Sequence, residues 1–207
     1  MDPNRRRAAG ELVAGLLTGI VFLVFENLLH LKIPYLVACT ILWTAYVARR
    51  WRKEPAVARE WGLRRDTLKA ATALCGAFFV AALAAMIAYR LIAGWRPLPA
   101  ASIIVFAIYP AWSLIQQFVL QALVTANLER LSLPRAAIVP VAAALFGLAH
   151  FPDWPLMGLC AGAGLAWTFI FLRARNLVPL AFTHAWLGTL VYYWVLERDP
   201  WLEMFPR

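Results

Sequence analysis

The chain has 207 residues, of which 63% are hydrophobic and 15% are charged, and its mean hydropathy is +0.68. Soluble domains contain roughly 45–50% apolar and about 25% charged residues, so this composition excludes an ordinary soluble domain. A net charge of +9 would suggest a nucleic-acid partner in a soluble protein. Here most of the 20 lysines and arginines lie between apolar runs, so we expect membrane lipid as partner and no nucleic acid.

Several apolar runs approach about 20 residues, the length at which a helix crosses the hydrocarbon core of a bilayer. The predicted fold class is therefore all-α, a polytopic membrane helical bundle with about seven transmembrane helices. In chain order the predicted spans cover residues 9–29, 33–49, 68–93, 100–128, 136–151, 154–173 and 176–197.

The distribution of Lys and Arg among the predicted loops indicates the orientation of the chain. A cytoplasmic N-terminus places most of these residues inside, and we expect a bacterial inner (cytoplasmic) membrane. The longest polar loop, residues 49–66, is interpreted as a topology determinant, with an anionic-lipid patch as the alternative. Only a few basic residues remain on the outer side: Lys32, Arg90, Arg96, Arg198 and Arg207.

Small residues recur in the sixth predicted span. Gly158 and Gly162 have the G-x-x-x-G spacing that lets two helices approach closely, and Cys160 and Gly164 repeat the interval one face along. All the cysteines lie inside apolar runs, which predicts packing roles instead of disulfides or zinc ligands. These cysteines are Cys39, Cys75 and Cys160.

Ionisable side chains within membrane spans are candidates for function. Glu11 and Glu26 lie near the two ends of the first predicted helix, where we expect their carboxylates to reach lipid headgroups. His150 ends the fifth predicted helix, and His184 lies inside the seventh. The two histidines are therefore the stronger candidates for a buried site.

Three glutamines in "SLIQQFVLQALV" accompany these histidines. Gln117 and Gln121 are four residues apart and share a helix face, which Gln116 borders. Together with His150 and His184 they can form one polar pocket between the fourth, fifth and seventh predicted helices. Two histidines with no nearby carboxylate or cysteine of suitable spacing make an incomplete metal site, so we predict no metal and no cofactor.

The two histidine segments, "FGLAH" (146–150) and "ARNLVPLAFTHAWLG" (174–188), follow the glutamine segment in a recognisable order. With the loop "WGLRRDTL" (61–68), they resemble the CAAX-protease and bacteriocin-processing family of intramembrane glutamic endopeptidases, the family of the CAAX-processing Rce1 proteins. That family has the motifs E-E-x-x-x-R, F-x-x-x-H and H-x-x-x-N on successive core helices. "FGLAH" matches the second motif in full, and His184 matches the histidine of the third.

The resemblance implies a four-helix protease-like core within residues 67–207. Residues 1–66 would supply two N-terminal transmembrane helices and a basic cytoplasmic loop. The implied activity is peptide-bond hydrolysis, with a glutamate as general base on a water and with histidine and asparagine orienting the water or stabilising the oxyanion. The implied substrate is a membrane-anchored or lipidated protein.

The sequence departs from the family at four motif positions. Gln116 and Gln117 stand where the glutamates are expected, Gln121 replaces the arginine, and Gly188 replaces the asparagine. Only the two histidines remain of the polar set, with Phe146 as a packing residue. A carboxamide cannot act as a base at neutral pH, and losing a general base costs ~10²–10⁴-fold in rate.

Three functions are compatible with this pattern. The first is a protein of protease fold that binds a peptide or lipidated protein, with hydrolysis impaired. The second is an active, atypical intramembrane protease that uses His150 and His184. The third is a non-enzymatic lipid-binding or transport protein in which glutamines only join helices. If Gln116, Gln117 and the two histidines point to separate neighbours instead of one cavity, only the third function remains.

Overall fold

The computed structural model describes residues 2–204, so Arg207, expected on the outer side, lies outside the described residues. The described residues form helices and no strand, which confirms the all-α fold class. In chain order the helices are α1 (Pro3–Asn27), α2 (Lys32–Lys53), α3 (Val57–Glu60), α4 (Leu68–Ala93), α5 (Ser102–Gln117), the π-helix η1 (Phe118–Thr125), α6 (Ala126–Arg130), α7 (Arg135–Leu148), α8 (Trp154–Ala174), α9 (Leu177–Leu190), the π-helix η2 (Val191–Val195) and α10 (Pro200–Met204).

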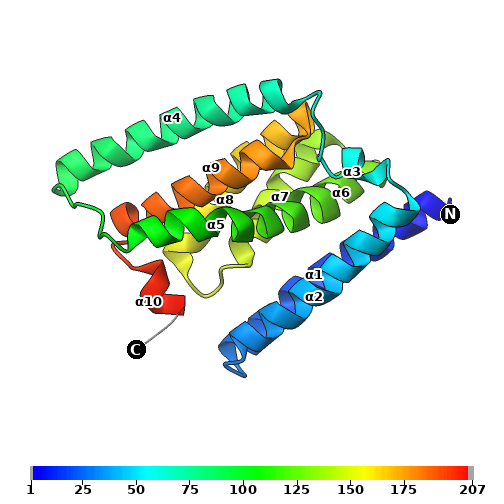
Figure 1. Ribbon diagram of the computed structural model, residues 1–207, viewed down its shortest axis with the longest axis horizontal. Helices are drawn as coiled ribbons and strands as arrows, with labels where there is room; N and C mark the ends of the chain where they lie inside the picture. Colours follow the sequence, from blue (N-terminus) through cyan, green and yellow to red (C-terminus); the bar gives the residue numbers. More distant parts are fainter. Residues whose placement is uncertain (1, 205–207) are drawn as a thin grey trace.

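The helices form a bundle flanked by a helical hairpin. α5, η1 and α6 make one continuous helix, and α5 packs against α9 while α7 packs against α8. α4 covers α8 and α9 along one side of the bundle (Figure 1). The hairpin of α1 and α2 lies on the other side, where α1 packs against η1 and α6 (Figure 1).

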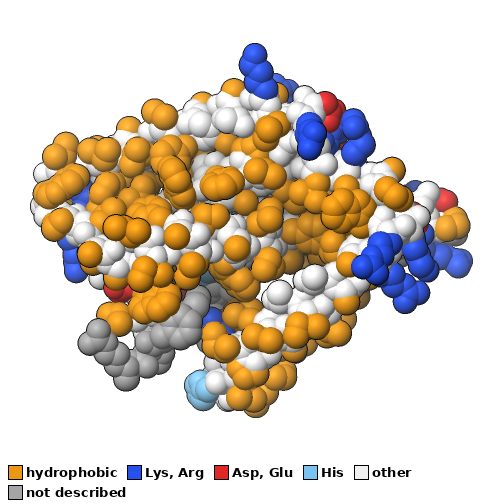
Figure 2. All heavy atoms as spheres, in the orientation of Figure 1, with side chains coloured by type: hydrophobic (Ala, Val, Ile, Leu, Met, Phe, Trp, Pro, Cys, Tyr) orange, Lys and Arg blue, Asp and Glu red, His pale blue; other side chains and the backbone are white. Residues whose placement is uncertain are grey.

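Four helices in the described part of the chain are long and apolar enough to cross a membrane. They are Pro3–Asn27, Leu68–Ala93, Ser102–Arg130 and Trp154–Ala174, and an 18-residue stretch of each has a mean hydropathy of 2.1, 2.2, 1.8 and 1.7, respectively. α7 is also apolar but shorter. Figure 2 shows hydrophobic side chains along the helices and Lys and Arg gathered mainly near their ends. The chain is an integral membrane protein.

The first helix begins earlier than its hydropathy predicts. The apolar pattern predicts a start at residue 9, whereas α1 begins at Pro3. Hydropathy locates only the part of a helix that lies in hydrocarbon, and the backbone hydrogen bonds of α1 continue beyond that part. This extension carries Arg5, Arg6 and Arg7.

The loops expected on the inner side meet at one end of the bundle. Arg5 donates a hydrogen bond to the carbonyl oxygen of Leu131 at 3.1 Å, which joins the start of α1 to the end of α6. The backbone N–H of Leu177 donates to the carbonyl oxygen of Gly62 at 3.0 Å. These contacts place the first residues of α1, α4 and α9 and the last residues of α6 at the same end of the bundle.

A second polar cluster lies at the opposite end. Arg90 and Arg96 both form ion pairs with Glu197, at 2.8 and 3.0 Å. Arg198 forms an ion pair with Asp153 at 2.5 Å, beside the loop between α7 and α8. The helices therefore run between two polar ends, as spans of one bilayer require.

The close approach of α7 and α8 uses one of the two predicted rows of small residues, the row that contains Gly164. A Cβ atom on Gly164 would lie 3.0 Å from Ala143 Cα, and one on Gly147 would lie 2.8 Å from a backbone oxygen of α8. Gly158 and Gly162 are exposed, with no contact within 4 Å of their Cβ positions, so their predicted packing role is wrong. Spacing identifies a small-residue face but cannot say which face meets a neighbour.

Glu11 is also placed differently from its prediction. Its side chain is buried instead of reaching lipid headgroups, and it forms an ion pair with Arg50 of α2. Tyr46 and Asn127 donate further hydrogen bonds to its carboxylate, the latter at 2.9 Å. A buried carboxylate needs such partners, and these come from segments distant in sequence.

Candidate functional site

The three glutamines lie where the long helix changes its winding. Gln116 and Gln117 end α5, and Gln121 lies inside the π-helix η1. Short π-helical segments interrupt α-helices rarely and frequently occur at functional sites. The change of winding therefore coincides with the polar part of this helix.

Two of the glutamines form a buried hydrogen-bonded network with His184. Gln121 Nε2 donates to Gln117 Oε1 at 3.2 Å, and Gln117 Nε2 lies 3.3 Å from His184 Nδ1. Gln121 Nε2 also lies 3.5 Å from Thr168 Oγ1. An amide nitrogen can only donate, so Nδ1 accepts and the imidazole proton belongs on Nε2. The network is uncharged and joins α5, η1, α8 and α9.

Aromatic rings surround the His184 imidazole. Its ring centroid lies 4.5 Å from that of Trp167, 5.5 Å from that of Phe146 and 5.8 Å from that of Tyr109. Phe146 also contacts the His150 ring at 5.2 Å. Phe146, the residue predicted to pack at the site, thus touches both histidines.

His150 lies in the loop between α7 and α8 and is only partly buried. Its Nδ1 atom lies 2.9 Å from the carbonyl oxygen of Phe146, and its Nε2 atom lies 3.6 Å from Cys160 Sγ. The carbonyl can only accept, so the proton belongs on Nδ1 and the lone pair of Nε2 faces the thiol. His150 thus presents a basic nitrogen on the side away from α7.

Gly188 packs against Tyr109. A Cβ atom at position 188 would lie 3.0 Å from Tyr109 Cε1 and 3.3 Å from its hydroxyl oxygen. The tyrosine ring occupies the space that an asparagine side chain would need at this position. Gly188 and Tyr109 are therefore complementary, which gives a steric reason for the missing asparagine.

Gln116 does not join the network of its neighbour. Its Oε1 atom is buried and has no hydrogen-bond partner among residues 2–204, and the same holds for Gln121 Oε1. A buried carbonyl oxygen without a donor costs about 1–3 kcal/mol. Two acceptors of the cluster thus have unused hydrogen-bonding capacity.

The structure brings together most of the predicted site residues. Gln117, Gln121 and His184 share hydrogen bonds, while His150 is linked to them through Phe146. We refer to the three glutamines, the two histidines, Phe146 and Gly188 as the Gln–His cluster. Within this cluster, the Oε1 atom of Gln116 has no hydrogen-bond partner in the described part of the chain.

Three further residues contact the site and were not predicted from the sequence: Tyr109, Trp167 and Thr168. Tyr109 and Ser113 precede Gln117 at intervals of four, and Ser113 Oγ donates to the Ala181 carbonyl oxygen at 2.8 Å. This polar stripe along one face of an apolar helix was a signal that could have indicated Tyr109. A threonine inside an apolar span similarly indicates an interhelical hydrogen bond.

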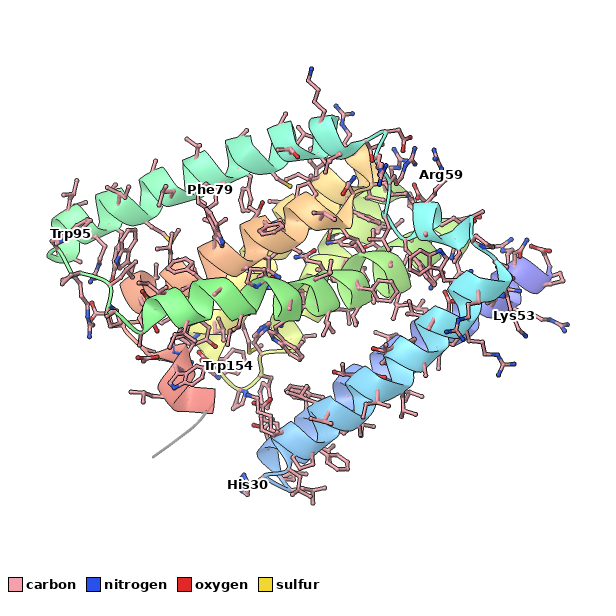
Figure 3. The ribbon with its side chains drawn as sticks, viewed as in Figure 1. His30, Lys53, Arg59, Phe79, Trp95 and Trp154 are labelled. Atoms are coloured by element: carbon pink, nitrogen blue, oxygen red, sulfur yellow. The ribbon has the colours of Figure 1, made fainter. Side chains whose placement is uncertain are left out.

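An apolar groove of about 500 Å³ lies between α4, α5 and α9. Trp186 of α9 contributes to it, two positions from His184, so the groove and the imidazole lie on different faces of that helix. Phe79 lines the groove from α4 (Figure 3). Among the described residues, no three His, Cys, Asp or Glu side chains are arranged to hold a metal ion. The remaining lining residues are Ile103, Phe106, Ala107 and Leu190.

The fold and the cluster define a polytopic helical membrane protein with a buried, uncharged Gln–His site. Residues 96–190 match the family of type II CAAX prenyl endopeptidase Rce1-like proteins. The matched segment contains every motif position from Gln116 to Gly188, which confirms the resemblance predicted from the motifs. No significant match was found among curated proteins or among solved structures.

Proposed function

We propose that the Gln–His cluster binds a peptide segment of a membrane-anchored or lipidated protein, with hydrolysis impaired. The observation that carries this proposal is the pair of buried, unpaired carbonyl oxygens on Gln116 and Gln121. An extended peptide offers backbone N–H groups, which are the donors that such oxygens need. The family match makes a prenylated CAAX protein the substrate class to test first.

The impairment follows from the chemistry of the amides. Gln116 and Gln117 occupy the positions of the family's glutamates, and neither carboxamide can take a proton from water at neutral pH. The amide of Gln117 is also occupied, because it bonds both His184 and Gln121. The lipid-binding or transport alternative, in which the glutamines only join helices, instead predicts that Gln117→Leu is tolerated and leaves peptide binding unchanged.

We also propose seven membrane crossings with a cytoplasmic N-terminus, in a bacterial inner membrane. Crossings by α2, α7 and α9, which have 22, 14 and 14 residues, would add to the four apolar spans to make seven. The boundary between a hairpin region, 1–66, and a core region, 67–207, is part of this proposal. The family match begins at residue 96 and so supports the later part of the core region.

The test is a paired binding and cleavage assay on the full chain in lipid nanodiscs, with a fluorescent prenylated CAAX peptide. We expect saturable binding without turnover, and weaker binding by His184→Ala because the imidazole anchors Gln117. Cleavage by the unaltered chain that His150→Ala abolishes would show that hydrolysis is retained. Absence of saturable binding would contradict the proposed function.

Restoring a glutamate in the first family motif, at position 116, gives a second readout. Gln116→Glu should raise hydrolysis by at most the ~10²–10⁴-fold that a general base supplies, since Gln121 and Gly188 still replace the family's arginine and asparagine. Gln116→Leu is the matched control, because it removes the amide without adding a base. Equal rates for the two variants would show that position 116 does not face the bound peptide.

A second candidate function is active hydrolysis with His150 as the base. The specific observation is that Phe146 holds Nδ1, which leaves Nε2 able to accept a proton. This candidate predicts a measurable cleavage rate that changes little with Gln116→Glu and disappears with His150→Ala. A rate that survives His150→Ala would exclude it.

A further inference from the structure

A cavity of about 370 Å³ lies at the basic end of the α1–α2 hairpin, outside the Gln–His cluster. This volume is within the range of small-ligand sites. Most of its lining comes from one face of α2, at intervals of three and four residues, and α1 contributes Arg7 from its second turn. The lining residues are Arg7, Tyr46, Arg49, Arg50, Lys53 and Glu54.

The charges on the cavity wall are unbalanced. Arg7 donates to both carboxylate oxygens of Glu54, at 2.6 and 2.7 Å, so these two side chains neutralise each other. Arg49 and Lys53 are exposed and make no ion pair within residues 2–204. The wall therefore presents two cations that no carboxylate of the described chain neutralises.

Arg50 is the fixed part of this wall. Only 9% of its surface is exposed, Glu11 pairs with it from the interior, and its guanidinium lies 5.5 Å from the Trp61 ring. Its Nε atom is buried and makes no hydrogen bond within residues 2–204, and a carboxylate oxygen of Glu54 lies 3.9 Å away as an ion pair. A guanidinium held in this way can bind an oxyanion with little further loss of side-chain freedom.

The cavity lies at the end of the bundle where the loops expected inside the cell meet. Figure 2 shows Lys and Arg side chains gathered at this end, and Figure 3 places Lys53 there, with Arg59 nearby on α3. Farther along α2, Ile41 and Leu42 are exposed by 63% and 69% and face the surroundings of the helix. An anion that also carries acyl chains would find apolar surface next to the cavity.

We propose that this cavity binds a phosphate group, carried either by an anionic phospholipid headgroup or by a soluble phosphate compound. Arg49 and Lys53 supply the unpaired cations and Arg50 adds a fixed guanidinium, a group that matches phosphate oxygens in geometry. The Arg7–Glu54 pair and Tyr46, whose hydroxyl donates to Glu11, form part of the wall. This site is independent of hydrolysis or peptide binding at the Gln–His cluster.

The experiment measures binding of short-chain phosphatidylglycerol to the purified full chain in detergent by native mass spectrometry, with phosphatidylcholine as the uncharged comparison. The test variant is Arg49→Gln with Lys53→Gln. The matched control is Arg52→Gln with Arg65→Gln, which removes the same charge from the same end without touching the cavity. All four positions are exposed, so both variants should fold.

We expect the test variant to lose roughly tenfold or more in phosphatidylglycerol affinity relative to the control, because it loses charge-assisted hydrogen bonds. Competition by inorganic phosphate distinguishes the two sources. Displacement of the lipid at low phosphate concentration supports a soluble compound, and resistance to phosphate supports the phospholipid. Equal losses in the two variants, or no preference for phosphatidylglycerol over phosphatidylcholine, would overturn the proposal.

Discussion

Gln116 and Gln117 are adjacent in sequence, yet their amides have different surroundings. Gln117 is fully buried and bonds both His184 and Gln121, whereas the Oε1 atom of Gln116 is buried without a partner. Adjacent residues of a helix point about 100° apart, so only one of them can face His184 directly. The two positions therefore contribute differently to stability.

We predict that Gln117→Leu lowers the free energy of unfolding by about 1–3 kcal/mol, because it leaves polar atoms of His184 and Gln121 without partners. Gln116→Leu is the matched control and should cost less, since it removes an acceptor that is unpaired already. Unfolding of the purified chain in mixed micelles measures both variants. Equal effects would show that the Gln117 hydrogen bonds contribute no net stability.

At the scale of elements, the contact between α7 and α8 depends on one face of α8. Gly164 is buried against Ala143, while Gly162, two positions earlier, faces away from other helices. Membrane helices associate largely through close van der Waals packing, so the face with the small residues in contact sets the helix distance. This contact also positions Trp167 and Thr168 beside His184 and Gln121.

We predict that Gly164→Val destabilises the protein by about 1–3 kcal/mol, because the added side chain overlaps Ala143 and forces the helices apart. Gly162→Val should change stability little, since no neighbour lies within 4 Å of that Cβ position. Thermal unfolding of both variants in the same detergent provides the measurement. A larger loss for Gly162→Val would contradict the placement of α8.

At the scale of the whole molecule, the polar residues lie at two ends and the apolar residues between them. Arg5, Gly62 and Leu177 take part in contacts at one end, while Arg90 and Glu197 pair at the other. A bilayer requires this separation, because charged groups are costly in hydrocarbon. The same separation makes the proposed topology accessible to labelling.

We predict that Trp95→Cys and Glu203→Cys each react with a maleimide that cannot cross the inner membrane. The reagent is added to intact cells in which it can reach the outer face of that membrane. A cysteine at Arg65 should react only after permeabilisation, because the basic loop is expected on the cytoplasmic side. The reaction at Glu203 tests the count of seven crossings, since one span fewer would place it inside. The background is a chain with alanine at Cys39, Cys75 and Cys160.

Much of the fold could be predicted from the sequence because its signals are local. Apolar runs and their lengths predict where the helices lie, and the predicted and observed bounds differ by only a few residues at most ends. The order of the histidine segments predicts the family, which the match over residues 96–190 confirms. The prediction for Glu11 was wrong because its partner, Arg50, comes from a different helix.

The sequence by itself determined the helices, the integral membrane class, the family and the replacement of the motif glutamates by Gln116 and Gln117. These properties depend on residue type and on neighbours along the chain. Only the tertiary structure decided that Thr168 and Tyr109 belong to the site, that Gly164 forms the close helix contact, and that Arg50 borders a cationic cavity. Such contacts join residues far apart in sequence, and each depends on which face of a helix meets its neighbour.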